Sequence, residues 1–416
     1  MATHSFGELM MALAFSEFPD SWPAEWEAAM ATFPGEVPFL ADAFISASSG
    51  FCAHPADIRA VLREAAARVR EDGELSRLAW FLHHLYHRDP MPPGPEVFAW
   101  PCVCNPLPER AAMIPALVLL AGVPRLWAMH EERGIPNEVT CATLRDIEIW
   151  LRHFQRAQGY WGLQNMGWPT NHFSGRLFRI GRLQFMHVKY TGPMRVFTHR
   201  QSGRVVALWN GEAKIRRDGY VDGTNEVFDE QARVPEFALT DEAASGYPIH
   251  PLGCVQPEKV TLPLAEWQPA LLQGDPVLDI HIPEDGKMDF AECGESLRQA
   301  REFFEYYFPE RPAAVAFVCG TWFFDAQYRQ MLPPTSNIVR FQREFYLHPL
   351  LSYEREPLWR VFGCVPEDLS AAPRDTALRR GMLDFKQAGG QLRCAGGCCL
   401  IEGMAWDGQR YQREKT

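Results

Sequence analysis

The chain has 416 residues, of which 47% are hydrophobic, 12% aromatic and 22% charged, and its formal charge is -11 at pH 7. This composition is typical of a folded protein of roughly two or three domains, which excludes disorder, collagen and coiled coil for most of the chain. The negative charge repels phosphate backbones and anionic membrane surfaces, so we expect neither nucleic acid nor a membrane as a partner.

No apolar run is long enough for a membrane helix. The longest, residues 111–123, contains Pro115 and is shorter than the roughly 18 to 20 residues that a span needs. The first residues lack a positive stretch ahead of an apolar one, so we do not expect a signal peptide. The cysteines number 11, an odd count that suits free thiols in a reducing compartment, and we expect a cytoplasmic location.

Two kinds of cluster suggest metal ligands. The cysteines in residues 102–104 and 394–399 lack the C-x2-C spacing of a zinc ribbon, so we interpret them as structural. His83 and His87 have the i, i+4 spacing that puts two imidazoles on one helical face, but they lack a third ligand and the glutamate of H-E-x-x-H. We therefore expect no metal, and a metal hydrolase is only a third alternative for the function.

The first 150 or so residues predict a mostly helical N-terminal domain, which we place at residues 1–175. Apolar residues recur there at three- and four-residue spacing, and Pro or Gly separates the periodic segments. Thr143 is the expected N-cap of the last helix. The predicted helices are residues 6–15, 22–31, 55–70, 75–87 and 144–154.

From residue 178 the pattern changes to short β-rich runs. Residues 183–190, 194–199 and 205–209 predict three strands of an antiparallel meander. The polar stretch 218–230 predicts a solvated loop, because its carboxylates lack the order of a calcium-binding loop.

The most regular pattern follows, in the second predicted domain, residues 176–416. A β-branched strand at 277–282 precedes a long amphipathic helix that begins near Asp289, and residues 313–318 predict a second buried strand. Further helices are predicted at 325–331 and 337–345. This order implies the α/β (α+β) class, with a mixed central sheet, flanking helices and a helix that crosses between two parallel strands.

Six blocks of the sequence carry a family resemblance: WGL (161–163), FRIGRLQF (178–185), GYPIHPLG (246–253), VLDIHIP (277–283), CGTWFFD (319–325) and LPPTSNIVRF (332–341). They resemble a bacterial group of GNAT-like acyltransferases, in which a helical N-terminal domain accompanies a GNAT-like C-terminal domain. The resemblance covers nearly the whole chain. It implies a GNAT-like central sheet, with acyl-CoA or CoA as co-substrate in a wedge between two splayed parallel strands.

The resemblance makes 277–282 the splayed strand, with the donor's pyrophosphate at the N-terminus of the helix that follows. Where the superfamily has Q/R-x-x-G-x-G/A, this chain has PEDGKMD at 283–289, with one glycine and three carboxylates. Carboxylates repel a pyrophosphate, and Lys287 offers one compensating charge. An acyl carrier protein is therefore an alternative donor, and a fold that has lost catalysis is an alternative to an enzyme.

His281 is the candidate general base, because an amine nucleophile must lose a proton and histidine titrates near neutrality. Strand alternation puts Asp279 on the same face as His281, where Asp279 is a candidate for substrate binding. The alternative for His281 is a hydrogen-bonded core histidine.

Residues that follow the second strand are candidates for the acceptor and donor sites, because ligands bind at the carboxyl ends of strands in α/β sheets. Trp322 would form a wall of the pocket, and Asp325 would hold the acceptor's ammonium group or else cap a helix. Ser336 and Asn337 are donors to the acyl donor or an N-cap, and Arg340 is a candidate phosphate ligand.

Three further residues complete the candidates. Tyr328 lies where some GNAT enzymes use a tyrosine to reprotonate the departing thiolate. His250, between two prolines, forms a lip of the acceptor site or a stiff connection. Cys319 lacks a neighbouring base in sequence, so we interpret it as buried packing rather than a nucleophile.

The residues and the resemblance together predict an N-acyltransferase. It would move an acyl group from an acyl thioester, carried by CoA or by an acyl carrier protein, to the amine of a small molecule or peptide. The alternative is a non-catalytic GNAT-like module that binds an acyl thioester, a peptide or a protein partner.

Overall fold

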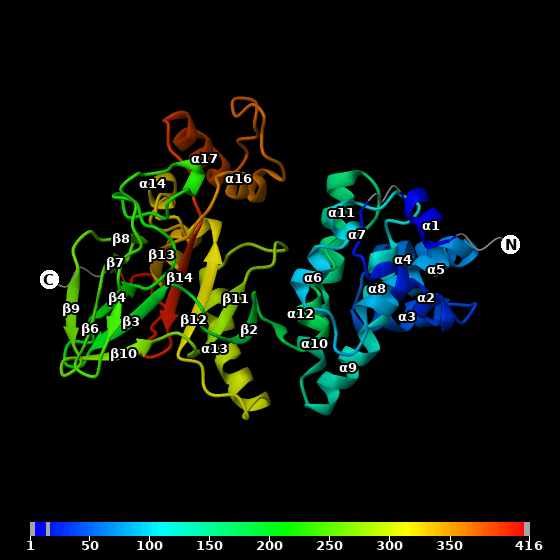
Figure 1. Ribbon diagram of the computed structural model, residues 1–416, viewed down its shortest axis with the longest axis horizontal. Helices are drawn as coiled ribbons and strands as arrows, with labels where there is room; N and C mark the ends of the chain where they lie inside the picture. The colour runs from blue at the N-terminus through cyan, green and yellow to red at the C-terminus, as the bar shows by residue number, and fades with distance from the viewer. Residues whose placement is uncertain (1–4, 14–16, 412–416) are drawn as a thin grey trace. The chain divides into compact units, whose positions relative to one another are not determined.

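Helices dominate the N-terminal part of the computed structural model, and sheets dominate the C-terminal part (Figure 1). The structure describes residues 5–13 and 17–411. The chain divides into two units, one of Met1–Ile180 with Pro283–Asp285 and the other of Gly181–Ile282 with Gly286–Thr416. The predicted domain boundary between residues 175 and 176 stays a prediction.

The first unit is mostly helical, as the apolar periodicity predicts, and it also contains one short strand. All five predicted helices begin within two residues of their expected starts, the last of them at Asp146. Residues 14 and 15 of the first predicted helix lie outside the described residues. The elements are α1 Phe6–Ala12, α2 Trp22–Ala31, η1 Pro38–Leu40, α3 Asp42–Phe51, α4 Ala56–Glu71, α5 Gly73–Tyr86, α6 Gly94–Phe98, α7 Pro101–Cys104, α8 Ile114–Ala121, α9 Val123–Glu132, α10 Asn137–Leu144, α11 Asp146–Gln158, α12 Thr170–Phe173 and β1 Leu177–Ile180.

A side-chain cap explains where helix α5 begins, and the cap predicted for helix α11 is not formed. The Asp72 carboxylate accepts hydrogen bonds from the N–H groups of Glu74 and Leu75, which fixes the start of α5. The prediction that Thr143 is the N-cap of α11 is wrong, because the N-cap residue is Arg145. Thr143 lies inside α10, where its hydroxyl donates to the Val139 carbonyl at 2.7 Å, so it satisfies a carbonyl within its own helix.

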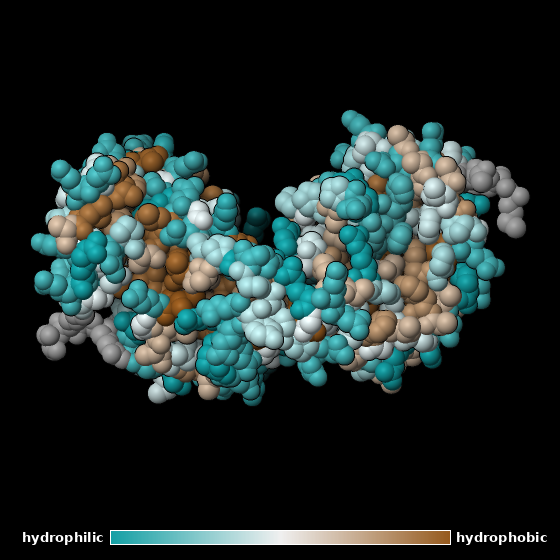
Figure 2. Space-filling model, turned by 90° about the horizontal axis from the view of Figure 1, so that it is seen from below, coloured by the Kyte–Doolittle hydropathy of each residue, from teal (hydrophilic) through white to brown (hydrophobic). Residues whose placement is uncertain are grey.

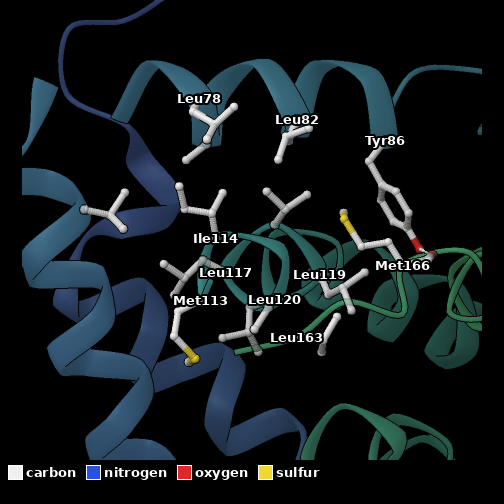
Figure 3. Packing of buried hydrophobic residues seen from close by; sticks show 14 of the residues in the cluster. Leu78, Leu82, Tyr86, Met113, Ile114, Leu117, Leu119, Leu120, Leu163 and Met166 are labelled. Carbon is white, nitrogen blue, oxygen red and sulfur yellow. Dashed lines mark hydrogen bonds between the residues drawn. The ribbon is translucent and has the colours of Figure 1, made fainter. Parts of the chain in front are cut away.

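The core of the first unit lies around α8, which is apolar on all sides and buried along its length. Leu78 and Leu82 of α5 face Ile114 and Leu117 of α8 (Figure 3). The Tyr86 hydroxyl, which is fully buried, donates to the Met166 carbonyl at 3.0 Å. Each fully buried large apolar side chain stabilises such a core by about 1.5 to 3 kcal/mol.

The two histidines that suggested a metal site belong to this helical packing. The His83 ring stacks between those of Phe39 and Trp80, at centroid distances of 4.9 and 5.4 Å. The His87 Nε2 atom lies 2.7 Å from the Val118 carbonyl oxygen. Burial lowers the pKa of both imidazoles to about 4, so they are neutral in the folded protein at pH 7.

The second unit has a mixed central sheet whose strands lie in the order β2-β11-β12-β14-β13. β11 and β12 are parallel, and the other pairs in this order are antiparallel. The α/β class with a mixed central sheet is therefore confirmed. These strands are β2 Leu183–Lys189, β11 Pro276–His281, β12 Ala316–Thr321, β13 Tyr346–Pro349 and β14 Ala395–Leu400.

A second sheet, in the order β10-β3-β4-β7-β8, contributes to the core beside one face of the central sheet. The predicted meander is wrong in one respect: β2 leaves it to pair with β11, and β3 pairs with β4 and β10 instead. A small third sheet has the order β5-β6-β9. The strands are β3 Met194–His199, β4 Val205–Trp209, β5 Ala238–Leu239, β6 Ala243–Gly246, β7 Pro248–His250, β8 Cys254–Val255, β9 Val260–Pro263 and β10 Trp267–Leu271.

The crossover between the two parallel strands is the long helix α13, Phe290–Tyr307, which buries the predicted apolar stripe. The second strand begins three residues later than predicted, and the helix expected at 325–331 is confined to one turn of α-helix at its end, Tyr328–Met331. Cys398 and Cys399 of the C-terminal cysteine cluster lie in β14, which is buried along its length, and Cys394 directly precedes this strand. The remaining elements are η2 Thr224–Glu226, η3 Trp322–Phe324, α14 Tyr328–Met331, α15 Asn337–Arg343, α16 Arg355–Phe362 and α17 Ala377–Gln387.

Polar residues cover much of both units in the view of Figure 2, with apolar patches between them. Among the described residues, no helix is long and apolar enough to cross a membrane.

Candidate active site

The parallel pair β11 and β12 separates before either strand ends. Their ladder has three residue pairs, the last of which joins Asp279 to Val318. Beyond it β11 continues to His281, still paired with β2, and β12 continues to Thr321, still paired with β14. We call residues 280–282 and 319–321 the splayed ends. This geometry agrees with the one that the resemblance implies.

The hydrogen bonds before the ladder show which backbone groups of β11 point toward β12. The Pro276 carbonyl accepts from the Val315 N–H at 2.9 Å, whereas the Asp275 carbonyl accepts from Tyr190 on the other side at 2.8 Å. Because backbone groups alternate along a strand, even-numbered residues of β11 turn theirs toward β12. The Ile282 N–H therefore points toward β12 at a place where the ladder has already ended.

Asp279 and His281 lie together on one face of β11, as the alternation predicts. The His281 Nε2 atom is 3.2 Å from the Asp279 Oδ2 atom, and both side chains are partly exposed, at 27% and 29%. Val318 and Gly320 of β12 lie on the same face, because partners in a ladder place their side chains on one side. The imidazole thus has a carboxylate beside its Nε2 atom, which is itself buried, while the rest of the ring is partly exposed.

No pattern in the sequence pointed to His348, which lies on this face two strands away from β12. Register aligns Gly320 with Gly396, and Gly396 with His348. A Cβ atom at Gly396 would come closer than 3.0 Å to the His348 ring, so the imidazole covers that glycine. Burial lowers the pKa of His348 to about 4, which keeps the ring neutral at pH 7.

Two carboxylates of the segment that follows β11 are paired within the first unit. Arg179 donates to both oxygens of Asp285, at 2.9 and 3.0 Å, and Arg145 lies 3.3 Å from it. The His153 imidazole and the Arg156 guanidinium hold the pKa of Glu284 below its usual value. These cations compensate charges that the sequence alone presents as unopposed.

In the second unit, Arg182 and Asp289 organise the rest of this segment. The Arg182 guanidinium, which is 8% exposed, donates to the carbonyls of Gly286 and Lys287, both at 2.7 Å. The Asp289 carboxylate is the N-cap of α13 and accepts the N–H groups of Ala291 and Glu292. Lys287 itself is exposed. The third carboxylate is therefore used in capping.

Arg340 lies beside the start of α13. Its guanidinium carbon is 3.9 Å from the centre of the Phe290 ring, and within the described part of the chain it has no carboxylate partner. Ser336 precedes α15 as its N-cap residue without a side-chain capping bond, and Asn337 is exposed on its first turn. Of these predicted donor-site residues, the structure brings Arg340 to the helix that follows the splayed strand.

Asp325 and Tyr328 are buried after β12. The Asp325 carboxylate, 3% exposed, accepts from the Gln327 N–H at 3.2 Å and from the Arg393 N–H at 3.0 Å, and burial raises its pKa. Tyr328 is fully buried, its hydroxyl lies 4.0 Å from the Met382 sulfur, and burial raises its pKa well above 10. The N-cap residue of α14 is Gln327, without a side-chain capping bond, so Asp325 does not cap that helix, and the catalytic roles of Asp325 and Tyr328 stay predictions.

Trp322 and His250, the other candidates for the acceptor site, are both at least partly exposed. The partly exposed Trp322 ring contacts that of Tyr328, with centroids 5.6 Å apart. His250 is largely exposed and accepts the Leu252 N–H at 3.1 Å; the partial burial of its ring, together with the Arg329 charge, lowers its pKa. Cys319 is buried, and its thiol pKa is raised by burial and by the charge of Asp279, which suits packing.

No group of three or more His, Cys, Asp or Glu residues that could hold a metal ion occurs within residues 5–13 and 17–411. The functional groups at the splayed ends are the His281 imidazole, the Asp279 carboxylate and backbone amides, and the guanidinium groups of Arg182 and Arg340 lie near the start of α13.

Two family models match this chain. A model of the GNAT-like C-terminal domain matches residues 177–399, and a model of the N-acyltransferase N-terminal domain matches residues 51–175. The chain therefore belongs to the family of GNAT-like N-acyltransferases that combine these two domains. The resemblance seen in the sequence is confirmed.

Solved acyltransferase structures share this fold. A mutant acyltransferase in complex with octanoyl-CoA has a TM-score of 0.61 at 21% identity, over 95% of this chain and 99% of that one. An acyltransferase in complex with decanoyl-CoA and teicoplanin has a TM-score of 0.58 at 21% identity, over 94% and 98%. One in complex with CoA and 10C-teicoplanin has a TM-score of 0.57, with the same identity and coverage. A comparison with curated proteins gave no match.

Proposed function

We propose that this protein transfers an acyl group from acyl-CoA to an amine by direct attack of the amine on the thioester. The observation that carries the proposal is the short ladder between β11 and β12, which ends at Asp279 and Val318 while both strands continue. Family membership supports the same reaction. Such a pair of splayed ends offers backbone amides to a ligand without breaking any ladder.

The donor would lie with its thioester at the splayed ends. The Ile282 N–H is directed there and would stabilise the negative charge that develops on the thioester oxygen, at no cost in reorganisation. The phosphates would meet Arg340 and Lys287 near the start of α13, where helix N–H groups also favour anions. The pairing of Glu284 and Asp285 with cations supports a CoA donor over the carrier-protein alternative.

In the chemical step, the amine nitrogen attacks the carbonyl carbon and forms the tetrahedral intermediate. His281 accepts the proton that the amine loses, and Asp279 stabilises the resulting imidazolium. The C–S bond then breaks, the amide forms, and CoA leaves as a thiolate that takes up a proton. Tyr328 stays a predicted proton source for that thiolate.

The acceptor is proposed to be the amine of a small molecule or peptide, bound near Trp322 and His250. The solved structures that share the fold contain octanoyl-CoA, decanoyl-CoA and teicoplanin, so medium-chain donors and glycopeptide amines are the first compounds to test. Ser336 and Asn337 stay candidate donor-site residues. The cytoplasmic location rests on the 11 cysteines, which are free throughout the structure.

The experiment is calorimetric titration with CoA and with acyl-CoAs of two to ten carbons, followed by a turnover assay that detects free thiol. We expect binding, and turnover with an amine acceptor. His281→Gln should lower turnover by about 10² while CoA affinity is unchanged, which is the usual loss for a general base.

A matched control is His199→Gln. His199 lies in the second sheet, with its Nε2 atom 4.0 Å from the Glu266 carboxylate, so it is a histidine–carboxylate pair away from the splayed ends. Its variant should keep wild-type turnover. Full turnover by the His281 variant would remove that residue from the mechanism, and binding without turnover of any amine would favour the non-catalytic module.

A further inference from the structure

The segment after β14, residues 401–411, lies beyond the matched GNAT-like domain, which ends at residue 399. We call it the C-terminal segment. It returns to the start of α13, on which the proposed donor site depends. None of its residues was a candidate in the sequence, because it carries no motif.

Trp406 of the C-terminal segment packs on the first turns of α13. Its ring is stacked on Phe290, with a centroid distance of 5.0 Å and an interplanar angle of 14°, and its Nε1–H donates to the Phe290 carbonyl at 2.7 Å. A Cβ atom at Gly294 would come closer than 3.0 Å to the indole, so the helix accepts this ring only because residue 294 is glycine. Trp406 also has a φ of 50°, an unusual value for a bulky residue.

The Glu344 carboxylate holds the C-terminal segment through hydrogen bonds to its backbone. The Glu344 side chain is fully buried, and its Oε1 atom accepts the N–H groups of Gly408 and Gln409. Arg410 donates to the Cys399 sulfur at 3.5 Å. Buried hydrogen bonds to a carboxylate are strong, so the contacts of Gly408 and Gln409 with Glu344 fix the backbone that follows Trp406 and thereby the position of Trp406.

The same segment borders Arg340. The Arg340 guanidinium lies over the Phe290 ring, and the Phe290 ring is also stacked with the Trp406 ring. Gly408 lies within 3.5 Å of the Arg340 side chain, measured from an ideal Cβ position. Arg340 therefore keeps a defined place although no carboxylate within the described residues holds it. A cation that is fixed by packing retains its charge for a ligand.

We propose that Trp406 is a positioning residue for the acyl donor: the C-terminal segment holds Phe290, and through it the Arg340 guanidinium, in place to bind a phosphate of the nucleotide part of acyl-CoA. This inference rests on the proposed function. It adds to that function a contribution from residues outside the matched domain.

The test compares two donors, acyl-CoA and the matching acyl-pantetheine, which carries the same thioester without the nucleotide. For Trp406→Ala and for Gly294→Ala, we expect the Kd of CoA and the KM of acyl-CoA to rise about tenfold, the loss typical of one hydrogen bond to a charged group. The KM of acyl-pantetheine and the kcat with saturating acyl-CoA should stay within about twofold. Trp359→Ala, which removes a partly exposed tryptophan of α16, is the control.

Gly294→Ala keeps the inference testable if Trp406→Ala fails to fold, because alanine favours a helix and only displaces the indole. Combining Trp406→Ala with Arg340→Ala should weaken CoA binding no further than Arg340→Ala alone. Unchanged CoA affinity in both single variants, or equal losses with both donors, would overturn the positioning role. Wild-type protein that binds neither donor would instead overturn the proposed function, and the positioning role with it.

Discussion

At the scale of residues, the pair of Asp279 and His281 shows which side-chain contacts can be predicted from the alternation along a single strand. Alternation along β11 correctly predicts that the two side chains share a face, and the structure places them 3.2 Å apart. The positions of Arg340 and His348 could not be predicted in this way. Arg340 meets Phe290 and His348 meets Gly396 across long separations in sequence, and one chain's local pattern carries no information on such contacts.

Replacing the carboxylate beside the proposed base tests this pair. Asp279→Asn keeps the shape of the side chain but removes the charge that stabilises the imidazolium, so we expect kcat to fall about tenfold or more while CoA affinity is unchanged. Steady-state kinetics and calorimetry measure the two quantities. Glu266→Gln, beside His199, should leave kcat unchanged; wild-type kcat in the Asp279 variant would show that the carboxylate takes no part.

At the scale of elements, buried and periodic segments were predictable and pairing was not. The stripe of α13 and the strand β11 follow from apolar spacing, so their positions agree with the sequence within a residue. The departure of β2 from its meander depends on its partner, β11, which is nearly 90 residues away in the chain. β14 was missed because its glycines and cysteines have weak strand preferences, and the surrounding strands β12 and β13 impose its conformation.

The glycines of β14 give a prediction about stability. In Gly396→Ala the new methyl group meets the His348 ring, which is buried and cannot move aside, so we expect the free energy of unfolding to fall by about 1 to 3 kcal/mol. Gly50→Ala, in helix α3 with open space around it, should not destabilise the protein.

Urea denaturation followed by tryptophan fluorescence measures both changes. Adding His348→Ala to the Gly396 variant should recover part of the loss, because it removes the ring that the methyl group meets. Equal stability of Gly396→Ala and wild-type protein would show that the imidazole does not cover this glycine.

At the scale of the whole molecule, buried histidines make the fold sensitive to acid. His54, His83, His87 and His130 of the first unit, and His348 of the second, all have a pKa lowered to about 4 by burial. The unfolded chain binds a proton at each with a pKa near 6.5. The stability that the neutral rings provide is therefore complete above pH 6.5 and is lost as the pH falls from 6.5 toward 4.

His54 gives the sharpest test of this dependence. It is 1% exposed, and neither ring nitrogen has a hydrogen-bond partner in the described structure, so His54→Leu removes a titrating group without breaking a side-chain hydrogen bond. A pKa of about 4 in the folded protein corresponds to a loss of about 2 kcal/mol between pH 7 and pH 5. We expect His54→Leu to lower the pH dependence of the free energy of unfolding by that amount, measured by urea denaturation at both pH values. As a control, replacing the largely exposed His250 by leucine should change the pH dependence of the free energy of unfolding far less. If this pH dependence is the same in the His54 variant as in the wild-type protein, then the His54 imidazole takes up a proton as readily in the folded protein as in the unfolded chain.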